Sequence, residues 1–409
     1  MKKIVLITTG QPSTNPRIVK EADALHAAGY EVTLLYSFFI QWATDKDRVL
    51  LQKVPWKYQL AGGSPDNKKN LYFFTRIRNK ISGVLNKYVG NNFLLSERAQ
   101  ARAYDELLSV AKQIKADWYI GHNLGALPIA VNAARFNNAK AGFDFEDYHR
   151  GENLPSEKKI LNHIIFLENK YLPHLQYYST ASPLITEITK KNHPNFKGVV
   201  ITLLNCFSLA QQPAFREKDA SDDTLQLFWF SQTIGINRGL ETLISALKIL
   251  NDPTIHLTLA GRCDEDMLAY IKTNAGNMMS TIHFAGIIQP EELPAFASQF
   301  DVGMAIELAV PENRNICLTN KIFTYLLAGN AIILSNTSMQ LRFNSLNHVG
   351  EGFAINDVNK LAEKINGYGD IIKLNKQKRK NYNLAKKEFN WEKKSEKLIL
   401  ILNTAINVE

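Results

Sequence analysis

One lysine stands in the first turn of an expected helix in the stretch LTNKIFTYLLAG, residues 318 to 329. Thr319 or Asn320 can cap this helix, and Gly329 follows its end. Lys321 therefore lies where free backbone N–H groups already favour an anion, so a cation there is unfavourable unless something negative is bound. Phosphate is a natural ligand for such a site. The alternative is a surface lysine that points to water, and the spacing alone does not decide between them.

A second site of the same kind occurs in FSQTIGINRGLETLISAL. We expect a strand to end at Ser231, a glycine-containing turn to follow, and Arg238 with Gly239 to open a helix. Arginine offers a bidentate fork to phosphate oxygens, and glycine lets the backbone approach closely. Two such turns suit a diphosphate better than a single phosphate. The stretch lacks GxGxxG and GxxxxGK[ST], which argues against a dinucleotide oxidoreductase and an ATPase.

Further candidates stand at the carboxyl ends of expected strands in the first half of the chain. His122 follows the strand WYIG, where we expect it to face a cleft, or else to be satisfied by backbone groups. The end of the next strand is crowded by Asp144, Glu146, Asp147 and His149. Such crowding either raises the pKa of a carboxylate and creates a general base, or marks a solvated turn.

The elements that position these residues follow from an alternation of apolar runs with amphipathic helical patterns, which is typical of βαβ units and parallel sheets. The expected strands are KIVLITTG, YEVTLLYS, ADWYIGHN, AKAGFDFED, QYYSTAS and GVVITLLN, then LQLFWFSQT, IHLTLAGR, IHFAGII, DVGMAIEL, NAIILSN and GFAIND. Between the two sets, residues 208 to 224 are polar and without periodicity, so we interpret them as a linker.

The expected architecture is α/β, with two doubly wound Rossmann-like domains that face a central cleft. The first domain covers residues 1–207 and the second covers residues 225–385. Residues 386–409 form a C-terminal helix that packs across both domains. Ligands of such sheets bind beyond the carboxyl ends of the strands, so both domains would direct their loops into the cleft.

Composition narrows the class of protein. The chain has 409 residues, of which 45% are hydrophobic and 21% charged, as in ordinary globular proteins. The N-terminal MKKIVLITTGQP reads as a first strand, and the three cysteines stand too far apart for a disulfide framework or a metal cluster, so we expect a cytoplasmic protein. A net charge of +9 indicates affinity for polyanions, whether nucleic acid, an anionic bilayer or a diphosphate. Without a recognition helix, nucleic acid is the weakest of these.

Residues 66–90, DNKKNLYFFTRIRNKISGVLNKYVG, depart from the alternation. Cations interleave here with aromatic and aliphatic residues. A basic amphipathic segment of this kind either lies peripherally on an anionic membrane surface or is a surface helix whose aromatic residues fill the core of its own domain.

The order of SQTIGINRGLETL, LTLAGR, IHFAGIIQPEELPAFASQFDVGMAI and LTNKIFTYLLAGNAIILSN resembles the donor lobe of retaining nucleotide-sugar glycosyltransferases with the GT-B fold, of the family 4 type. In the first half, STNPRIVKEADALHAAGYEVTLL, YIGHNLGALPIAVNAAR and GFDFEDYH resemble the acceptor lobe of that family. The resemblance covers nearly the whole chain. It implies transfer of a sugar from a nucleotide-diphosphate sugar to a hydroxyl of a saccharide or lipid-linked acceptor, with no cofactor and no required metal.

The resemblance also assigns residues. Lys321 and Arg238 would hold the diphosphate and stabilise it as it leaves, with His122 as the third catalytic candidate. The base of the donor would lie against the turns at Gly261 and at residues 286–288. The donor-binding set is Gln232, Thr233, Gly235, Arg238, Gly261, Arg262, Ile287, Ile288, Glu312, Leu318, Lys321 and Thr324. The acceptor-binding set is Thr9, Gly10, Asn15, Arg17, His122, Asn123, Asp144 and Glu146.

The chain departs from the family pattern in its charges. Thr233 stands where the family often has an arginine, and Ile316 and Thr324 stand where it commonly has two glutamates. A threonine cannot replace a charge-assisted contact to the donor ribose, worth about 1.5–3 kcal/mol. Glu312 is either a substitute carboxylate or a solvated loop residue. The first strand-to-helix turn has no glycine pair, so its contact with the donor diphosphate is not predicted.

Three functions follow from these observations. The first is a hexosyltransferase of cell-surface polysaccharide or glycoconjugate synthesis. The second is a GT-B nucleotide-sugar epimerase-like enzyme, which would use the same phosphate grip without an acceptor. The third is a non-catalytic GT-B partner subunit that kept the fold and lost charges at Thr233 and Thr324.

Overall fold

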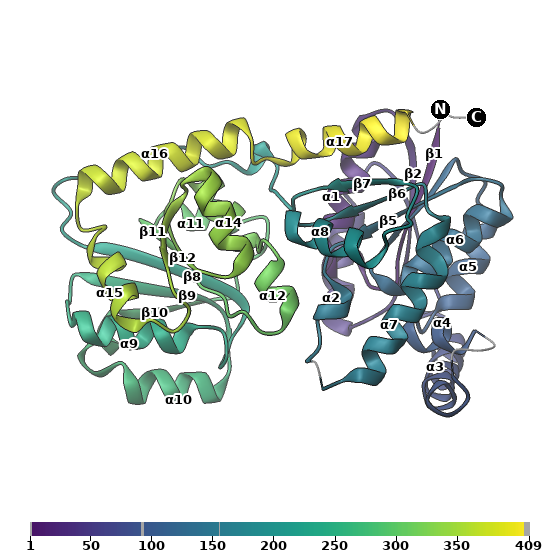
Figure 1. The fold of residues 1–409 in the computed structure, drawn as a ribbon, viewed down its shortest axis with the longest axis horizontal. Helices are drawn as coiled ribbons and strands as arrows, with labels where there is room; N and C mark the ends of the chain where they lie inside the picture. Colours follow the sequence, from purple (N-terminus) through teal and green to yellow (C-terminus); the bar gives the residue numbers. More distant parts are fainter. Residues whose placement is uncertain (1, 91–93, 155, 405–409) are drawn as a thin grey trace. The chain divides into compact units, whose positions relative to one another are not determined.

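The computed structural model describes residues 2–90, 94–154 and 156–404. Its contacts divide the chain into two compact units (Figure 1). The first unit runs to Leu203 and includes the chain again from Ser395, and the second unit is Leu204–Lys394. Each unit is described by itself below.

The first unit is built on a parallel sheet of seven strands in the order β3-β2-β1-β4-β5-β6-β7. The strands are β1 (Lys3–Thr8), β2 (Glu31–Ser37), β3 (Lys57–Ala61), β4 (Trp118–His122), β5 (Lys140–Phe145), β6 (Tyr177–Thr180) and β7 (Val199–Thr202). The helices are α1 (Pro16–Ala27), α2 (Gln41–Leu51), α3 (Lys69–Val89), α4 (Leu95–Gln100), α5 (Tyr104–Gln113), α6 (Leu127–Phe136), α7 (Lys158–Tyr171) and α8 (Pro183–Asn192).

The second unit is built on a parallel sheet of six strands in the order β10-β9-β8-β11-β12-β13. The strands are β8 (Leu225–Ile234), β9 (Ile255–Cys263), β10 (Ile282–Gly286), β11 (Val302–Ala305), β12 (Ala331–Ser335) and β13 (Gly350–Phe353). The helices are α9 (Leu240–Leu250), α10 (Glu265–Asn274), α11 (Leu293–Ala297), α12 (Glu312–Ile316), α13 (Asn320–Ala328), α14 (Ser338–Asn347), α15 (Val358–Asn366) and α16 (Ile371–Lys387).

The strands form because their sequences are short, almost wholly apolar runs suited to a sheet covered on both faces. Every residue of β4, β11 and β12 is buried. Both sheets reverse their strand order beside their first strand, at β1/β4 in the first unit and at β8/β11 in the second. Such a switch point is where doubly wound sheets bind ligands, beyond the carboxyl ends of the strands.

The expected two-unit α/β architecture is confirmed, with differences in detail. β3 was not expected, because its pattern KYQLA has three exposed positions and lacks a continuous apolar run. β8 continues to Ile234 instead of ending at Ser231, with a register shift against β9 between Phe230 and Thr233.

The stretch 208–224, expected as a linker, belongs to the second unit. The Lys218 N–H donates to Asn375 Oδ1 at 2.8 Å, and Asn375 Nδ2 donates back to the Lys218 carbonyl at 3.0 Å. These bonds attach it to α16.

The C-terminal segment forms α17 (Trp391–Thr404), within which the chain passes from the second unit to the first at Ser395. Asn403 Oδ1 accepts a hydrogen bond of 2.6 Å from the Tyr30 hydroxyl, and Leu398 and Leu402 are buried. Among the described residues, none of the helices is both long enough and apolar enough to cross a membrane.

Candidate functional site

Lys321 lies in the first turn of α13 and forms an ion pair with Glu307. Its Nζ is 2.6 Å from Glu307 Oε1 and 5.0 Å from the centre of the Trp229 ring. Glu307 follows β11 and is held by Ser335 at the end of β12. The Ser335 hydroxyl accepts from the Glu307 N–H and donates to the Glu307 carbonyl, each at 2.8 Å. The protein itself therefore supplies a negative partner for the lysine.

The N-terminus of α13 lacks the expected side-chain cap. Thr319 is the N-cap residue, but its hydroxyl makes no capping bond and its Oγ1 is buried without a partner. Asn320 lies inside the helix, where its Oδ1 accepts from Asn205 Nδ2 at 3.0 Å. The prediction that one of these side chains caps the helix is wrong, because neither is directed at the first-turn N–H groups. Those groups remain an electropositive neighbour of Lys321.

Arg238 lies in the turn between β8 and α9, and its Nη1 donates to Ser231 Oγ at 3.3 Å. The next residue, Gly239, has φ +81°, and a Cβ there would lie 2.5 Å from Ile306 Cγ2. Only glycine fits this close approach. Because Ile306 immediately precedes Glu307, the contact seats the Arg238 turn against the segment that holds Lys321.

The two cations therefore contact neighbouring positions of β8. Trp229 contacts Lys321, and Ser231, two positions further along, contacts Arg238. This part of β8 flanks the switch point of the second sheet. Both residues that the sequence singled out as phosphate ligands thus lie along the same strand.

Most of the other predicted donor residues lie in the loops that follow the strands of the second sheet. Gly261 lets β9 lie close to β8, because a Cβ at this position would lie only 2.2 Å from the Ser231 carbonyl oxygen. Gly235 is buried beside Asp264. Exposed positions at the edge are Gln232, Arg262, Ile287 and Glu312, and partly exposed ones are Thr233 and Ile288.

Two predicted donor residues point into the unit. Leu318 is buried, and Thr324 has no exposed surface. The Thr324 hydroxyl donates to the Asn320 carbonyl of its own helix at 3.0 Å. The place where the family pattern has a ribose-binding carboxylate is thus occupied here by a small side chain that is satisfied internally.

In the first unit, four polar residues stand in register across the sheet near the carboxyl ends of their strands: Thr8, His122, Asp144 and Ser179. All four are buried. Parallel strands in register bring such residues to one level, so the sequence order alone does not reveal the row.

Arg17 of α1 reaches this row and binds Asp144 in a bidentate ion pair. Arg17 Nε and Nη2 donate to the two carboxylate oxygens, the second at 2.9 Å, and the Ser179 hydroxyl donates to Asp144 Oδ1 at 2.6 Å. Burial alone would raise the pKa of Asp144, but the charge and hydrogen bonds of Arg17 outweigh it and lower that pKa. The expectation that crowding raises a carboxylate pKa is therefore wrong for Asp144.

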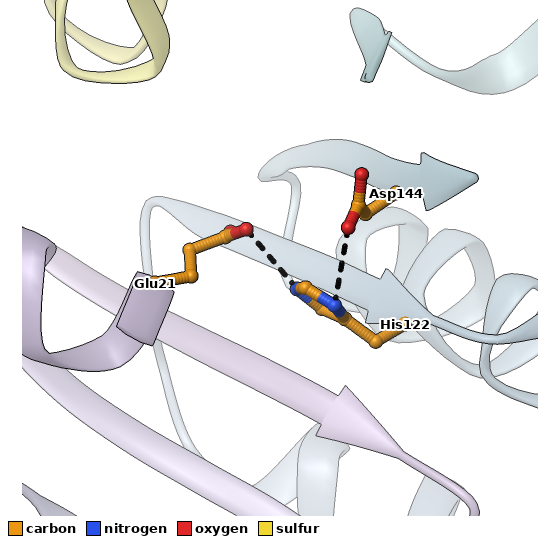
Figure 2. Close-up of side chains that lie close together, drawn as sticks. All are labelled: Glu21, His122 and Asp144. Carbon is orange, nitrogen blue, oxygen red and sulfur yellow. Dashed lines mark ion pairs between the residues drawn. The ribbon is translucent and has the colours of Figure 1, made fainter. Parts of the chain in front are cut away.

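His122 lies between two carboxylates, Glu21 on one side and Asp144 on the other (Figure 2). Its Nε2 is 3.3 Å from Glu21 Oε2, and its Nδ1 is 3.5 Å from Asp144 Oδ2 and 3.1 Å from Glu146 Oε1. Burial alone would lower the pKa of His122, but the nearby charge of Glu21 and the hydrogen bond to Glu146 raise it to about 10. The imidazole is therefore protonated at neutral pH.

This setting differs from the one expected for His122. We expected His122 to face a cleft or to be satisfied by backbone groups, but its ring has no exposed surface and lies against the carboxylate of Glu21 on α1. A protonated ring cannot accept a proton as a general base. The partly exposed member of the cluster is Glu146, whose side chain is 24% exposed.

The three side chains in Figure 2 also place ligand atoms within 4.8 Å of one another, as a metal site would. A metal ion needs lone pairs that converge on one point, whereas the imidazole lies between the carboxylates and turns a different nitrogen to each. Asp144 is also already paired with the Arg17 guanidinium. The geometry fits a proton on His122 better than a metal ion.

The remaining acceptor candidates form the first loop of the unit. Thr9 Oγ1 donates to Asn123 Oδ1 at 2.7 Å, and Asn123 Nδ2 donates to Thr8 Oγ1 at 2.9 Å. Asn15 caps α1 by accepting from the Ile18 N–H at 3.2 Å, and Gly10 is partly exposed beside it. The structure thus gathers the predicted acceptor residues around the switch point β1/β4.

Comparison with known proteins supports the fold. No protein-family model and no curated protein matches the chain. Sucrose-phosphate synthase from Thermosynechococcus elongatus superposes with a TM-score of 0.72 at 14% identity, over 99% of each chain. HepE of Anabaena, solved in complex with UDP, gives 0.68 at 13% identity, over 99% of this chain and 100% of that chain. TarM gives 0.67 at 12% identity, over 99% of each chain.

The chain has the GT-B fold. At these identities the likeness establishes the architecture, and the activity has to be argued from the residues of the two switch points.

Several residues of the GT-B switch points were missed from the sequence. Glu307 directly follows the strand DVGMAI, so an acid at a strand's carboxyl end was a usable signal. Glu21 had no such signal, because on the helix PRIVKEADALHA it reads as an ordinary polar position. Trp229 and Ser231 lie inside an expected strand, and their sequence pattern does not indicate that they contact Lys321 and Arg238.

Proposed function

We propose that the protein is a retaining glycosyltransferase of the family 4 type, which transfers a hexosyl group from a nucleotide-diphosphate sugar to a hydroxyl of a saccharide or lipid-linked saccharide. The observation that carries the proposal is that Lys321 and Arg238 contact neighbouring residues, Trp229 and Ser231, of the strand beside the switch point of the second unit. Structures of HepE with UDP and with UDP-glucose support a nucleotide-sugar donor for this fold.

The diphosphate would be held by charge and by backbone. Arg238 supplies a bidentate fork, Lys321 a compact positive charge, and the uncapped first turn of α13 its free N–H groups. The Lys321 and Glu307 side chains are only 10% and 12% exposed, so the phosphate would reach the ammonium by taking the place of Glu307. As the glycosidic bond breaks, these groups stabilise the growing charge on the leaving diphosphate without a metal ion.

The acceptor hydroxyl is proposed to bind at the first unit near Thr9, Gly10, Asn123 and Glu146, the partly exposed members of the predicted set. Retention is proposed to follow from front-face attack, in which the leaving phosphate accepts the proton of the incoming hydroxyl. We place the reaction in the cytoplasm, at the inner face of the membrane where the acceptor is lipid-linked, in cell-surface polysaccharide or glycoconjugate synthesis.

The test is metal-free calorimetry and thermal shift with UDP, GDP, ADP and dTDP. We expect one diphosphate to stabilise the protein, by about 2.7 kcal/mol at a hundred times its Kd. Lys321→Ala should remove this effect and keep the fold. Lys360→Ala, which removes an exposed lysine of α15, is the matched control.

A flat response to every nucleotide would contradict the proposal. It would favour a non-catalytic GT-B partner subunit, for which the buried Thr324 is the supporting observation. Turnover of the nucleotide sugar in the absence of any acceptor would favour the epimerase-like alternative.

A further inference from the structure

The helix α3 faces the first unit with its polar side. Thr75, Asn79, Ser82 and Asn86 recur at helical spacing, and Thr75 and Ser82 are buried. Asn79 Nδ2 donates to the carbonyls of Arg98 and Ala99, at 2.7 and 2.9 Å. A surface helix of a globular protein normally buries its apolar side, so α3 is inverted.

Further contacts fix this orientation. Arg78 forms ion pairs with Glu106 at 2.6 Å and with Asp105 at 2.9 Å. Arg102 donates to the Thr75 hydroxyl, and the Ser96 hydroxyl donates to Asn86 Oδ1 at 3.2 Å. The bonds are spread along the helix, so it cannot turn its other face inward without losing them.

The opposite face of α3 is apolar and exposed. Its large side chains are between 42% and 84% exposed; they are Phe73, Phe74, Ile77, Ile81, Val84, Leu85 and Tyr88. At about 100° per residue they occupy one continuous stripe. The expectation that the aromatic residues of this segment fill the core of their own domain is wrong for Phe73 and Phe74, because the polar contacts above already occupy the inward side.

A row of cations borders this stripe. Lys69, Arg76, Lys80 and Lys87 follow one another at intervals of seven, four and seven residues, which places them along one edge of the helix. All four are exposed, and none pairs with an acid among the described residues. No aspartate or glutamate occurs between Asn67 and Ser96.

We propose that the exposed face of α3 binds the surface of an anionic lipid bilayer. The apolar stripe would enter the boundary of the acyl chains, and the cationic row would lie at the level of the anionic headgroups. A second copy of the chain fits less well, because it would bring its own cationic row to the same interface. This inference rests on α3 alone and holds whether or not the proposed activity is correct.

The test is flotation of the full chain with vesicles of pure phosphatidylcholine and with vesicles containing an equal share of phosphatidylglycerol. We expect binding to the anionic vesicles only, weakened by high salt. Each of Phe74→Gln and Ile81→Gln should weaken binding by about ten-fold, which corresponds to one buried side chain. The triple variant Lys69→Glu, Arg76→Glu and Lys80→Glu should abolish it.

Matched controls separate these effects from general surface changes. Ile249→Gln on α9 removes an apolar side chain that is 56% exposed, and Lys360→Glu reverses an exposed charge; both should bind normally. Arg78 is left intact because it holds α3 in place. Absence of binding, equal binding to neutral vesicles, or dimerisation through α3 without vesicle binding would each overturn the proposal.

Discussion

The two units share a sheet topology, and each places a cation–carboxylate pair near the carboxyl ends of its central strands, yet the two pairs differ in exposure. In the first unit, the Arg17 and Asp144 side chains are 3% and 1% exposed. In the second unit, the Lys321 and Glu307 side chains are 10% and 12% exposed. A switch point therefore does not by itself make a binding site. The pair covered by α1 is part of the core, while the side chains of the second pair each keep about a tenth of their surface exposed.

The difference extends to the hydrogen bonds around each pair. Asp144 accepts from two nitrogens of a planar fork and from Ser179, so its charge is satisfied within the unit. Lys321 is held by one carboxylate and one ring face. A guanidinium fork locks its partner, whereas an ammonium on a flexible stem can change partners.

The largest expected effect is on stability. Arg17→Met should lower the free energy of unfolding by about 3–5 kcal/mol, because it leaves the Asp144 charge buried and unpaired. Lys321→Met should also lower the free energy of unfolding, but by at least about 2 kcal/mol less than Arg17→Met, because the Glu307 side chain that it leaves unpaired is partly exposed. Urea unfolding of both variants measures the difference. Equal losses would mean that the two pairs are equally structural, and Arg17→Met with Asp144→Leu should recover part of the first loss.

The buried imidazole predicts a pH dependence in the first unit. The pKa of His122 is about 10 in the folded state and about 6.5 when unfolded, so the folded chain holds a proton that the unfolded chain lacks between these values. This contribution is complete below about pH 6.5 and is lost as the pH rises through 10, with a slope of up to about 1.4 kcal/mol per pH unit.

The measurement is unfolding free energy against pH for the wild type and for His122→Gln, with His26→Gln as the exposed control. The difference in unfolding free energy between the wild type and His122→Gln should shrink as the pH rises. The His26→Gln control should show the same dependence on pH as the wild type. Parallel curves would show that His122 is not protonated in the folded protein.

The smallest expected effect is on affinity in the second unit. Glu307→Gln removes the charge that competes with phosphate for Lys321, so nucleoside diphosphate should bind about three- to ten-fold more tightly. Titration calorimetry measures this. Weaker binding would contradict the view that Glu307 is a displaceable partner and would make it a residue that positions the lysine.

Much of the fold was predictable because strand and helix patterns are local. Five strands of the second sheet were expected at their places, the expected strand GFAIND overlaps β13 by two residues, and Lys321 and Arg238 were identified from helix starts. β3 was missed because edge strands need no continuous apolar run. Glu307 was missed as the partner of Lys321 because the two residues belong to different elements, and pairing across space leaves no mark in either local pattern.

The sequence by itself determined the order of elements, the cations at two helix starts and the amphipathic character of α3, since each depends on neighbours along the chain. Tertiary structure alone decided which charges meet and which face is covered. The amphipathic pattern of α3 is the same whether its apolar side points in or out, and polar contacts such as those to Arg98, Ala99 and Glu106 turn that side outward. Likewise, the packing of α1 over the first sheet leaves the Arg17–Asp144 pair less exposed than the Lys321–Glu307 pair of the second unit.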